Sequence, residues 1–248
     1  SRSLAVGGVA IVQAAAAAVA KARVIAGHLL EVSPEDLEFV NGSFRVKGDP
    51  ASAKTIQAVA WEAFTAHDLP DGTDPNLFGT STVDPQVFSY PHGTHLCAVE
   101  VDTETGRPTI RKYVAVDDVG VQINPMIVEG QIHGGITQGI AQALWEGAAY
   151  DEDGNLVTAS LADYLLPTAV DVPEYVTDRT VTPSTTHPLG TKGVGEAGTI
   201  ASTPAVVNAV VDAIRHLGVS DVLMPCTPQT VWRALQAAVA SDSEGGAA

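Results

Sequence analysis

Residues 190–214, GTKGVGEAGTIASTPAVVNAVVDAI, carry a glycine-rich loop that leads into a run of small apolar residues. The glycines at 193, 195 and 198 have no Cβ, so the main chain there can come close to a bulky polar group. The loop contains one carboxylate, Glu196. We expect a helix from Pro204 to Leu217, and a loop before it that presents Glu196 among backbone N–H groups to a bound group.

The G-x-G-x-x-G spacing of residues 193–198 formally matches the fingerprint of dinucleotide-binding sites. That fingerprint requires an apolar strand directly before the loop and a helix that opens inside it. Residues 186–191, THPLGT, are turn-like and are broken by Pro188. The sequence therefore argues against a Rossmann site.

Two further motifs accompany this loop. Residues 117–120 read DDVG and residues 129–139 read EGQIHGGITQG, while the chain starts with Ser1-Arg2-Ser3. Together the three motifs resemble the last third of the large, catalytic subunit of the molybdenum hydroxylases, the family of xanthine oxidase and aerobic carbon monoxide dehydrogenase. The resemblance spans essentially the whole chain, so we expect a C-terminal portion of such a subunit.

This resemblance implies that Glu196 is the general base at a molybdenum centre. It would remove a proton from a water-derived oxygen that attacks carbon monoxide, an aldehyde or an N-heterocycle, and a partly dehydrated pocket would make it a stronger base. The implied cofactor is molybdopterin-type, in the cytosine dinucleotide form, and its pterin sulfurs hold the molybdenum, so the chain supplies no metal ligand. The residues expected to bind the cofactor are Gln131, Ser1, Arg2, Ser3, Lys192, Gly193, Val194 and Gly195.

Electrons from such a reaction need a route out of the chain. Its 2 cysteines, Cys97 and Cys226, are too few to hold an iron–sulfur cluster alone, and they are expected to be buried free thiols of a reduced, cytoplasmic protein. The resemblance implies iron–sulfur clusters and FAD on partner subunits. The expected partners are the remaining N-terminal part of the large subunit, an iron–sulfur subunit and an FAD subunit, in a dimer of heterotrimers. By itself the fragment is expected to be inactive.

Composition narrows the classes of partner. The 248 residues include only 13 Lys and Arg and carry a net charge of −16, which argues against nucleic acid as a partner. The Ala-rich segment 9–30 is interrupted by Gln13, Lys21, Arg23 and His28, so no apolar run reaches the roughly 20 residues that span a bilayer. We expect neither nucleic-acid binding nor a membrane span.

The residue patterns predict a mixed α+β fold, in which antiparallel hairpins and a sheet pack with helices. Helices are expected at 9–30, 56–66, 125–145, 159–165, 204–217 and 230–239, and a short one after Ser33-Pro34. Hairpins are expected at 37–46 around Asn41-Gly42, at 95–116 and at 148–157, with a strand at 174–181. The loop 69–90 suggests three regions: 1–80, then 81–240 with the cofactor and base residues, then a flexible tail at 241–248.

Some of these residues also have a plain structural interpretation. A glutamate at a helix start often only accepts hydrogen bonds from the loop, and Glu196 would then belong to a noncatalytic assembly portion of the complex. His92 and His95 resemble a pair of metal ligands, but no third ligand accompanies them. Residues three apart on a strand point to opposite faces, which favours packing over metal binding.

The expected helix 125–145 has two distinct sets of residues. Glycines at 130, 134, 135 and 139 recur every four or five positions, so another backbone or a cofactor can lie close to one side. Gln131, Gln138 and Gln142 share one face. If they have no functional role, they form a polar stripe that faces solvent. The family resemblance gives a cofactor role to Gln131 alone.

Overall fold

The computed structural model describes residues 1–85 and 87–245. The chain divides into two compact units: one comprises Ser1–Arg2 with Val87–Ala248, and the other comprises Ser3–Gln86. We call them the C-terminal unit and the N-terminal unit and describe each by itself. The boundary predicted from the sequence lay after residue 80.

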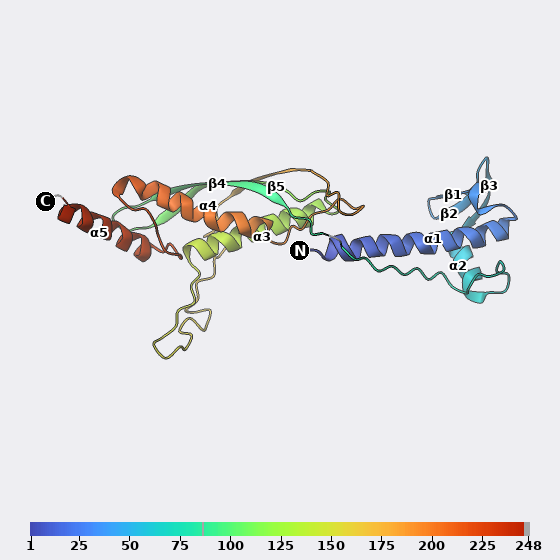
Figure 1. Cartoon of the computed structure of the whole chain (residues 1–248), viewed down its shortest axis with the longest axis horizontal. Helices are drawn as coiled ribbons and strands as arrows, with labels where there is room; N and C mark the ends of the chain where they lie inside the picture. Colours follow the sequence, from blue (N-terminus) through green and yellow to red (C-terminus); the bar gives the residue numbers. More distant parts are fainter. Residues whose placement is uncertain (86, 246–248) are drawn as a thin grey trace. The chain divides into compact units, whose positions relative to one another are not determined.

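The N-terminal unit combines helices with a small antiparallel sheet of order β1-β2-β3 (Figure 1). Its core contains the fully buried side chains of Ile25, Phe44 and Val59. In chain order its elements are the π-helix Leu4–Gly8, α1 (Val9–Leu30), the 3-10 helix Pro34–Asp36, β1 (Leu37–Val40), β2 (Ser43–Val46), β3 (Asp49–Thr55) and α2 (Ile56–Thr65).

Local sequence signals explain most of these boundaries. The Asn41-Gly42 turn joins β1 to β2 with φ of 48° and 74°, the left-handed values that a two-residue hairpin turn needs. The Thr55 hydroxyl accepts a hydrogen bond from Ala58 N at 3.2 Å and caps α2. The expected helix 9–30 and the first hairpin are confirmed.

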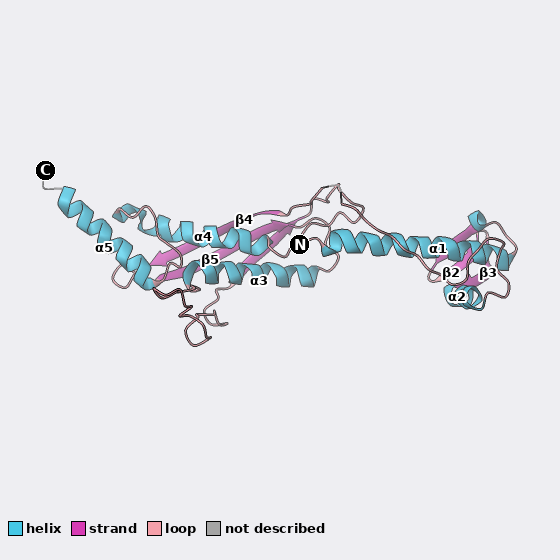
Figure 2. Ribbon diagram, turned by 60° about the horizontal axis from the view of Figure 1, so that its bottom comes forward, coloured by secondary structure: helices cyan, strands magenta, loops and turns pink. Residues whose placement is uncertain are grey.

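The C-terminal unit packs helices against a mixed sheet of order β4-β5-β6 (Figure 2). Strands β4 and β5 are antiparallel, as predicted, whereas β6 runs parallel to β5. Its elements are β4 (His92–Val101), β5 (Pro108–Asp118), α3 (Pro125–Leu144), β6 (Tyr175–Thr180), α4 (Ala197–Ile214), the 3-10 helix Arg215–Leu217 and α5 (Pro228–Gly245). The predicted α+β class is confirmed.

Helices α3 and α4 lie side by side along the sheet, as Figures 1 and 2 both show. Glycines permit this approach, because a Cβ on Gly135 would lie 3.0 Å from Gly198 Cα and one on Gly139 would lie 1.9 Å from Ser202 Oγ. Around Gly130 and Gly134 there is no atom within 4 Å of such a Cβ among the described residues. The expected close approach of another backbone to this helix is therefore confirmed at Gly135 and Gly139.

Helix α4 starts at Ala197, seven positions before the Pro204 at which the sequence predicted its start. Proline removes one helical hydrogen bond and usually marks a helix start or a kink, which is why the prediction was wrong. Tertiary contacts favour the longer helix here. The Thr199 hydroxyl donates to Gly135 O at 2.8 Å, and that of Thr203 donates to Gly139 O at 3.3 Å.

Other predictions need correction. Residues 159–165 form turns rather than a helix, because the Ser160 hydroxyl accepts from Ala162 N and donates to Asp163, a local arrangement that competes with helix formation. The hairpin at 148–157 is reduced to a single bridge between Tyr150 and Leu156. Strand β3 was not predicted. Helix α5 continues to Gly245, and the remainder of the expected flexible tail, residues 246–248, lies outside the described residues.

Two helical stretches, Leu4–Leu29 and Ala197–Leu217, are long and apolar enough to cross a membrane by length and composition alone. Core helices of water-soluble proteins and signal sequences pass the same test, so the finding is weak. The absence of a membrane span stays a prediction.

Candidate functional site

The three sequence motifs meet in the C-terminal unit. A Cβ on Gly193 would lie 2.5 Å from the Ser1 carbonyl oxygen, and one on Gly195 would lie 2.4 Å from the Ser1 hydroxyl oxygen. The same position on Gly195 is 3.9 Å from Nε2 of Gln131. No residue larger than glycine fits at 193 or 195 without a shift, so these two glycines bring the loop, Ser1 and Gln131 together.

Glu196 stands at the junction between this loop and α4. It is the residue before the first turn, with φ −109°, and its side chain makes no capping hydrogen bond. Its carboxylate is 68% exposed, and Oε1 lies 3.8 Å from the Ser1 nitrogen. The described residues therefore leave Glu196 free to meet a bound group, and they do not by themselves form the partly dehydrated pocket that was expected around it.

Several hydrogen-bonding groups of the loop have no protein partner. In the described part of the chain, no protein acceptor takes a hydrogen bond from the backbone N–H groups of Gly193, Val194 and Gly195. The buried hydroxyl of Thr191 and Nδ1 of His187 are likewise unpaired there. Buried polar groups are normally satisfied, so this cluster fits a polar ligand held largely by main-chain donors.

Lys192 is held by a buried ion pair. Its ammonium lies 3.0 Å from Oδ1 of Asp118, and the two side chains are 10% and 0% exposed. Its backbone N donates to Val119 O at 2.8 Å, and Val121 N donates to Gly190 O at 2.9 Å. The end of β5 thus fixes the loop from both sides, and the Lys192 side chain is engaged with Asp118.

Asp118 accepts several hydrogen bonds at the point where β5 ends. Burial favours its neutral form, but the donors outweigh burial and hold its pKa well below the usual range of an aspartate. These donors are the N–H of Gly120, the ammonium of Lys192 and the hydroxyls of Thr182 and Thr180. In the sequence Asp118 stood out only as part of a motif; two adjacent aspartates after an apolar strand were the available signal.

Replacing Asp118 with Asn should loosen the loop. Removal of one partner of a buried pair leaves the Lys192 charge uncompensated and costs about 3 kcal/mol or more, or about 100-fold in an opening equilibrium. We expect amide hydrogen exchange of residues 186–196 to accelerate by about that factor in the holoenzyme that contains this chain, measured by mass spectrometry.

A matched control is Glu100→Gln, which breaks the exposed pair of Glu100 with Arg111 at 2.7 Å and should leave exchange in the loop unchanged.

The stabilisation of the loop by Asp118 should depend on pH in one direction. Because the pKa of Asp118 is lowered by folding, its stabilisation is present above about pH 4 and is lost as pH falls towards its folded pKa. Loop protection that is equal in wild type and Asp118→Asn would contradict this role.

Other side chains predicted for the site have contacts of their own. The guanidinium of Arg2 lies over the ring of Phe88, 5.2 Å from its centroid, and the side chain of Val194 packs on the hydrophobic core. Ser3 belongs to the N-terminal unit, where it precedes the π-helix. The structure brings Ser1, Gln131 and residues 193–196 together, and the expected roles of Arg2, Ser3 and Lys192 at the cofactor stay predictions.

Four other residues noted in the sequence, Gln138, Gln142, His92 and His95, have structural partners. The side-chain oxygens of Gln138 and Gln142 lie 3.5 and 3.1 Å from the hydroxyls of Thr199 and Thr203, so this face of α3 points towards α4. His92 is 64% exposed and His95 is 1% exposed, as opposite faces of a strand predict.

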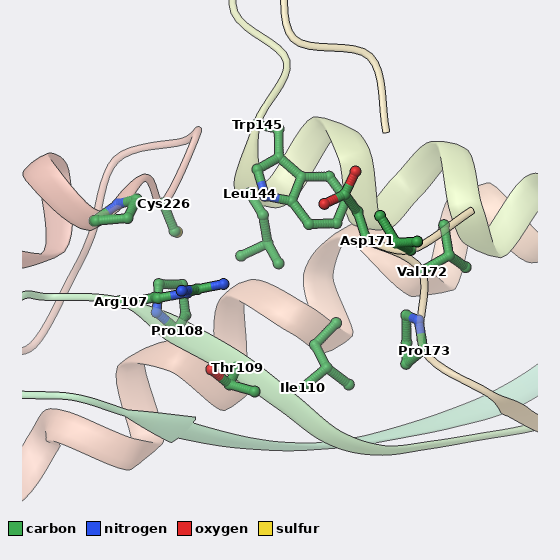
Figure 3. Close-up of a pocket in the computed structure, with 12 residues that line it drawn as sticks. Arg107, Pro108, Thr109, Ile110, Leu144, Trp145, Asp171, Val172, Pro173 and Cys226 are labelled. Atoms are coloured by element: carbon green, nitrogen blue, oxygen red, sulfur yellow. The ribbon is translucent and has the colours of Figure 1, made fainter. Parts of the chain in front are cut away.

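A pocket of about 310 Å³ lies away from these residues, between the start of β5, the end of α3 and the loop before β6 (Figure 3). Trp145 and Leu144 of the α3 end face Arg107 and Pro108 across it, and Cys226 also contributes to its lining. Burial raises the pKa of the Cys226 thiol to about 11, with Asp221 adding to the effect. At neutral pH this thiol is protonated and a poor nucleophile.

Comparison with known proteins identifies the fold. Residues 1–173 match the family model of the molybdopterin cofactor-binding domain. The carbon monoxide dehydrogenase large chain of Hydrogenophaga pseudoflava is 48% identical over 95% of this chain, and the nicotine 6-hydroxylase large subunit of Paenarthrobacter nicotinovorans is 39% identical over 94%. This chain spans 29% of the length of each relative.

Comparison with solved structures gives the same result as comparison of the sequences. A Cu,Mo-CO dehydrogenase in its carbon monoxide reduced state superposes with a TM-score of 0.87 at 41% identity, covering 96% of this chain and 30% of that one. Quinoline 2-oxidoreductase from Pseudomonas putida superposes with a TM-score of 0.79 at 41% identity, covering 90% of this chain and 28% of that one. The chain belongs to the molybdopterin cofactor-binding domain family and resembles the large subunits of the molybdenum hydroxylases.

Proposed function

We propose that this chain forms the cofactor-binding and base-bearing part of a molybdenum hydroxylase, with Glu196 as the general base. The observation that carries the proposal is the convergence of Ser1, Gln131 and residues 193–196, which lie far apart in the sequence. An exposed carboxylate at this convergence, beside unpaired main-chain donors, matches what a base next to a polar cofactor requires.

The donors present fit a pterin-type group with ring heteroatoms and phosphate. The N–H groups of residues 193–195 would donate to it, and the glycines leave room for close approach. When bound, the cofactor supplies the two-electron redox chemistry. The Gln131 amide would orient a polar group at the centre, while Glu196 would accept the proton of the attacking water-derived oxygen.

The finer parts of the proposal follow the named relatives. We propose a small substrate of the carbon monoxide, aldehyde or N-heterocycle class, since the relatives include carbon monoxide dehydrogenases, a nicotine hydroxylase and an aldehyde oxidoreductase. The cofactor would be the cytosine dinucleotide form. Partner subunits would carry iron–sulfur clusters and FAD, in a cytoplasmic dimer of heterotrimers that includes the rest of the large subunit.

Native mass spectrometry with metal and nucleotide analysis of the complex as isolated tests this assembly. We expect this chain in a particle with additional polypeptide, molybdenum, iron, FAD and an acid-released cytidine nucleotide. A particle without molybdenum would overturn the proposed cofactor. Molybdenum without iron would overturn the proposed iron–sulfur partner only.

A noncatalytic assembly role is the second candidate, and the position of Glu196 favours it: a carboxylate at a helix start is stabilised there whether or not it does chemistry. The two candidates differ in what happens to turnover when the carboxylate is neutralised. Cofactor content alone does not separate the two candidate functions, because the cofactor-binding loop is the same in both cases.

Gln131→Ala should weaken the site without unfolding it, because the side chain is exposed on the second turn of α3 and its Nε2 points towards Gly195. Loss of one hydrogen bond of about 1.4 kcal/mol corresponds to a roughly tenfold decrease in turnover or in molybdenum content. Both are measured on the purified holoenzyme. Gln142→Ala, on the same helix face, is the control and should leave both unchanged; equal results for the two variants would remove Gln131 from the site.

A further inference from the structure

Four side chains join β6 to α3. Nε2 of His133 lies 3.2 Å from the Thr177 hydroxyl oxygen, and the hydroxyl oxygens of Tyr175 and Thr137 lie 2.9 Å apart. His133 and Thr137 are one helical turn apart on α3, and Tyr175 and Thr177 share one face of β6. We call these four residues the α3–β6 ladder. In the described part of the chain, its two contacts are the only side-chain hydrogen bonds between α3 and β6.

The hydrogen bond at the Tyr175 end of the ladder has a defined direction. The Thr137 hydroxyl donates its one proton to His133 O at 2.9 Å, so it accepts from the Tyr175 hydroxyl. Burial raises the pKa of the Tyr175 phenol, which therefore keeps the proton that it donates. Tyr175 is thus the donor that holds Thr137 of α3 against β6.

Aromatic contacts fix the Tyr175 ring itself. Its centroid lies 5.8 Å from that of Tyr113 and 5.6 Å from that of His133, with interplanar angles of 71° and 62°. Tyr113, on β5, is fully buried. Such edge-on pairs are favourable because the positive edge of one ring meets the negative face of another. Tyr175 therefore connects the buried core at β5 with α3.

The ladder ends close to the turn that carries Gln131. Towards the start of α3, a cavity of about 70 Å³ is lined by Glu129 on the helix and by Thr177 on the strand. Among the described residues, His133 is therefore the first residue of α3 that bonds to β6. It follows Gln131 by two positions.

The location of the Gln131 amide depends on how α3 is rotated about its axis. Two positions correspond to about 200° around a helix, so Gln131 lies nearly opposite His133. Its side chain is exposed and makes no hydrogen bond among the described residues, while Nε2 is 3.9 Å from the Cβ position of Gly195. A rotation of α3 by about 10° would move an atom about 6 Å from the helix axis by about 1 Å.

The helix is held on two sides. Helix α4 contacts α3 at Gly135 and Gly139, through hydrogen bonds from Thr199 and Thr203. The ladder holds α3 to β6, and its two hydrogen bonds lie one turn apart along the helix. Two bonds along one line of the helix surface resist a rotation that a single bond would permit.

We propose that Tyr175 and Thr177 are positioning residues, which fix the rotation of α3 through Thr137 and His133 and thereby the location of the Gln131 amide. The proposal rests on the proposed role of Gln131 at the cofactor. It adds to that role the part of the fold that places this amide beside the loop 193–196.

Thr177→Val in the holoenzyme tests this, because valine keeps the shape of threonine and removes the hydroxyl that bonds to His133. Two quantities are measured: the rate of molybdenum loss on warming, by metal analysis, and kcat, by reduction of an electron-acceptor dye with carbon monoxide, nicotine and benzaldehyde offered in turn. The quantity that changes more in Gln131→Ala decides. We expect it to worsen about 3- to 10-fold, the range that corresponds to one hydrogen bond.

Two further variants are the controls. Thr177→Ser keeps the hydroxyl and should retain the wild-type value. Thr94→Val makes the same change on β4 of the same sheet, at an exposed residue whose hydroxyl has no hydrogen bond among the described residues, and should also have no effect. Equal values for Thr177→Val and Thr94→Val would overturn the proposal. If Thr177→Val does not assemble, Tyr175→Phe, which removes the other hydrogen bond of the ladder, decides by the same comparison.

A double-mutant cycle separates positioning from a general loss of stability. If Thr177 acts through Gln131, adding Thr177→Val to Gln131→Ala should cause no further change. Effects that multiply would show that the ladder acts independently of Gln131 and would overturn the proposal. A Gln131→Ala protein with wild-type values of both quantities would overturn the role of Gln131 as well, whereas an impaired Gln131→Ala beside an unaffected Thr177→Val would overturn the positioning role alone.

Discussion

Glu196→Gln in the holoenzyme is expected to lower kcat by about 100- to 10,000-fold, the contribution typical of a general base. The amide has nearly the shape of the carboxylate but cannot take up the proton at neutral pH. Turnover with a dye acceptor and molybdenum content are measured on the same preparation. Molybdenum content should not change, because the loop donors are main-chain groups.

The structure indicates that Glu196→Gln changes the charge of the side chain with little effect on the packing of α4. The Glu196 side chain is 68% exposed and makes no capping hydrogen bond, so its neutralisation removes no hydrogen bond that caps α4 among the described residues. Glu129→Gln, an exposed carboxylate in the second turn of α3, is the matched control and should retain full activity. Normal molybdenum content with unchanged kcat in Glu196→Gln would leave the noncatalytic assembly role as the better explanation.

Gly198→Val is expected to prevent stable packing of α4 on α3, with a cost of about 3 kcal/mol or more. A Cβ at this position would lie 2.6 Å from Ile132 O and 2.9 Å from Ile136 N. Both are backbone atoms inside α3 and cannot move aside as a flexible side chain would. The yield of molybdenum-loaded holoenzyme and its temperature of half-inactivation are the measurements.

The control for this prediction is Gly134→Ala in α3, where nothing among the described residues lies within 4 Å of the new Cβ. Alanine should stabilise that helix by about 1 kcal/mol relative to glycine. Opposite shifts of the half-inactivation temperature for the two variants would support the close packing of α3 and α4. A stable, fully loaded Gly198→Val protein would show that the two helices have room to separate.

Elements that are determined by adjacent residues could be predicted from the sequence. The Asn41-Gly42 turn, the Thr55 cap and the long Ala-rich helix α1 are each decided by a few adjacent residues, and the structure confirms them. The family motifs also predicted that Ser1, Gln131 and the 193–196 loop belong to one site, and these residues do lie close together. Their chemical roles remain predictions.

Long-range contacts explain what the sequence did not reveal. Nothing local to Pro204 shows that glycines on another helix favour an earlier start of α4. Likewise, the partnership of Asp118 with Lys192 joins a strand end to a loop more than seventy positions away in the chain. A buried charge looks unfavourable in isolation and becomes interpretable only when its partner is known.

The parallel pairing of β6 with β5 has a consequence for the order of events during biosynthesis. Antiparallel β4 and β5 can form as soon as their short connection is made, but β6 must first return across the whole of α3 and the segment that follows it. Contacts of such wide sequence separation form slowly because loop closure must precede them. The loop with Glu196 emerges from the ribosome later still. Nascent chains will therefore hold a folded hairpin before residues 193–196 have joined Ser1 and Gln131.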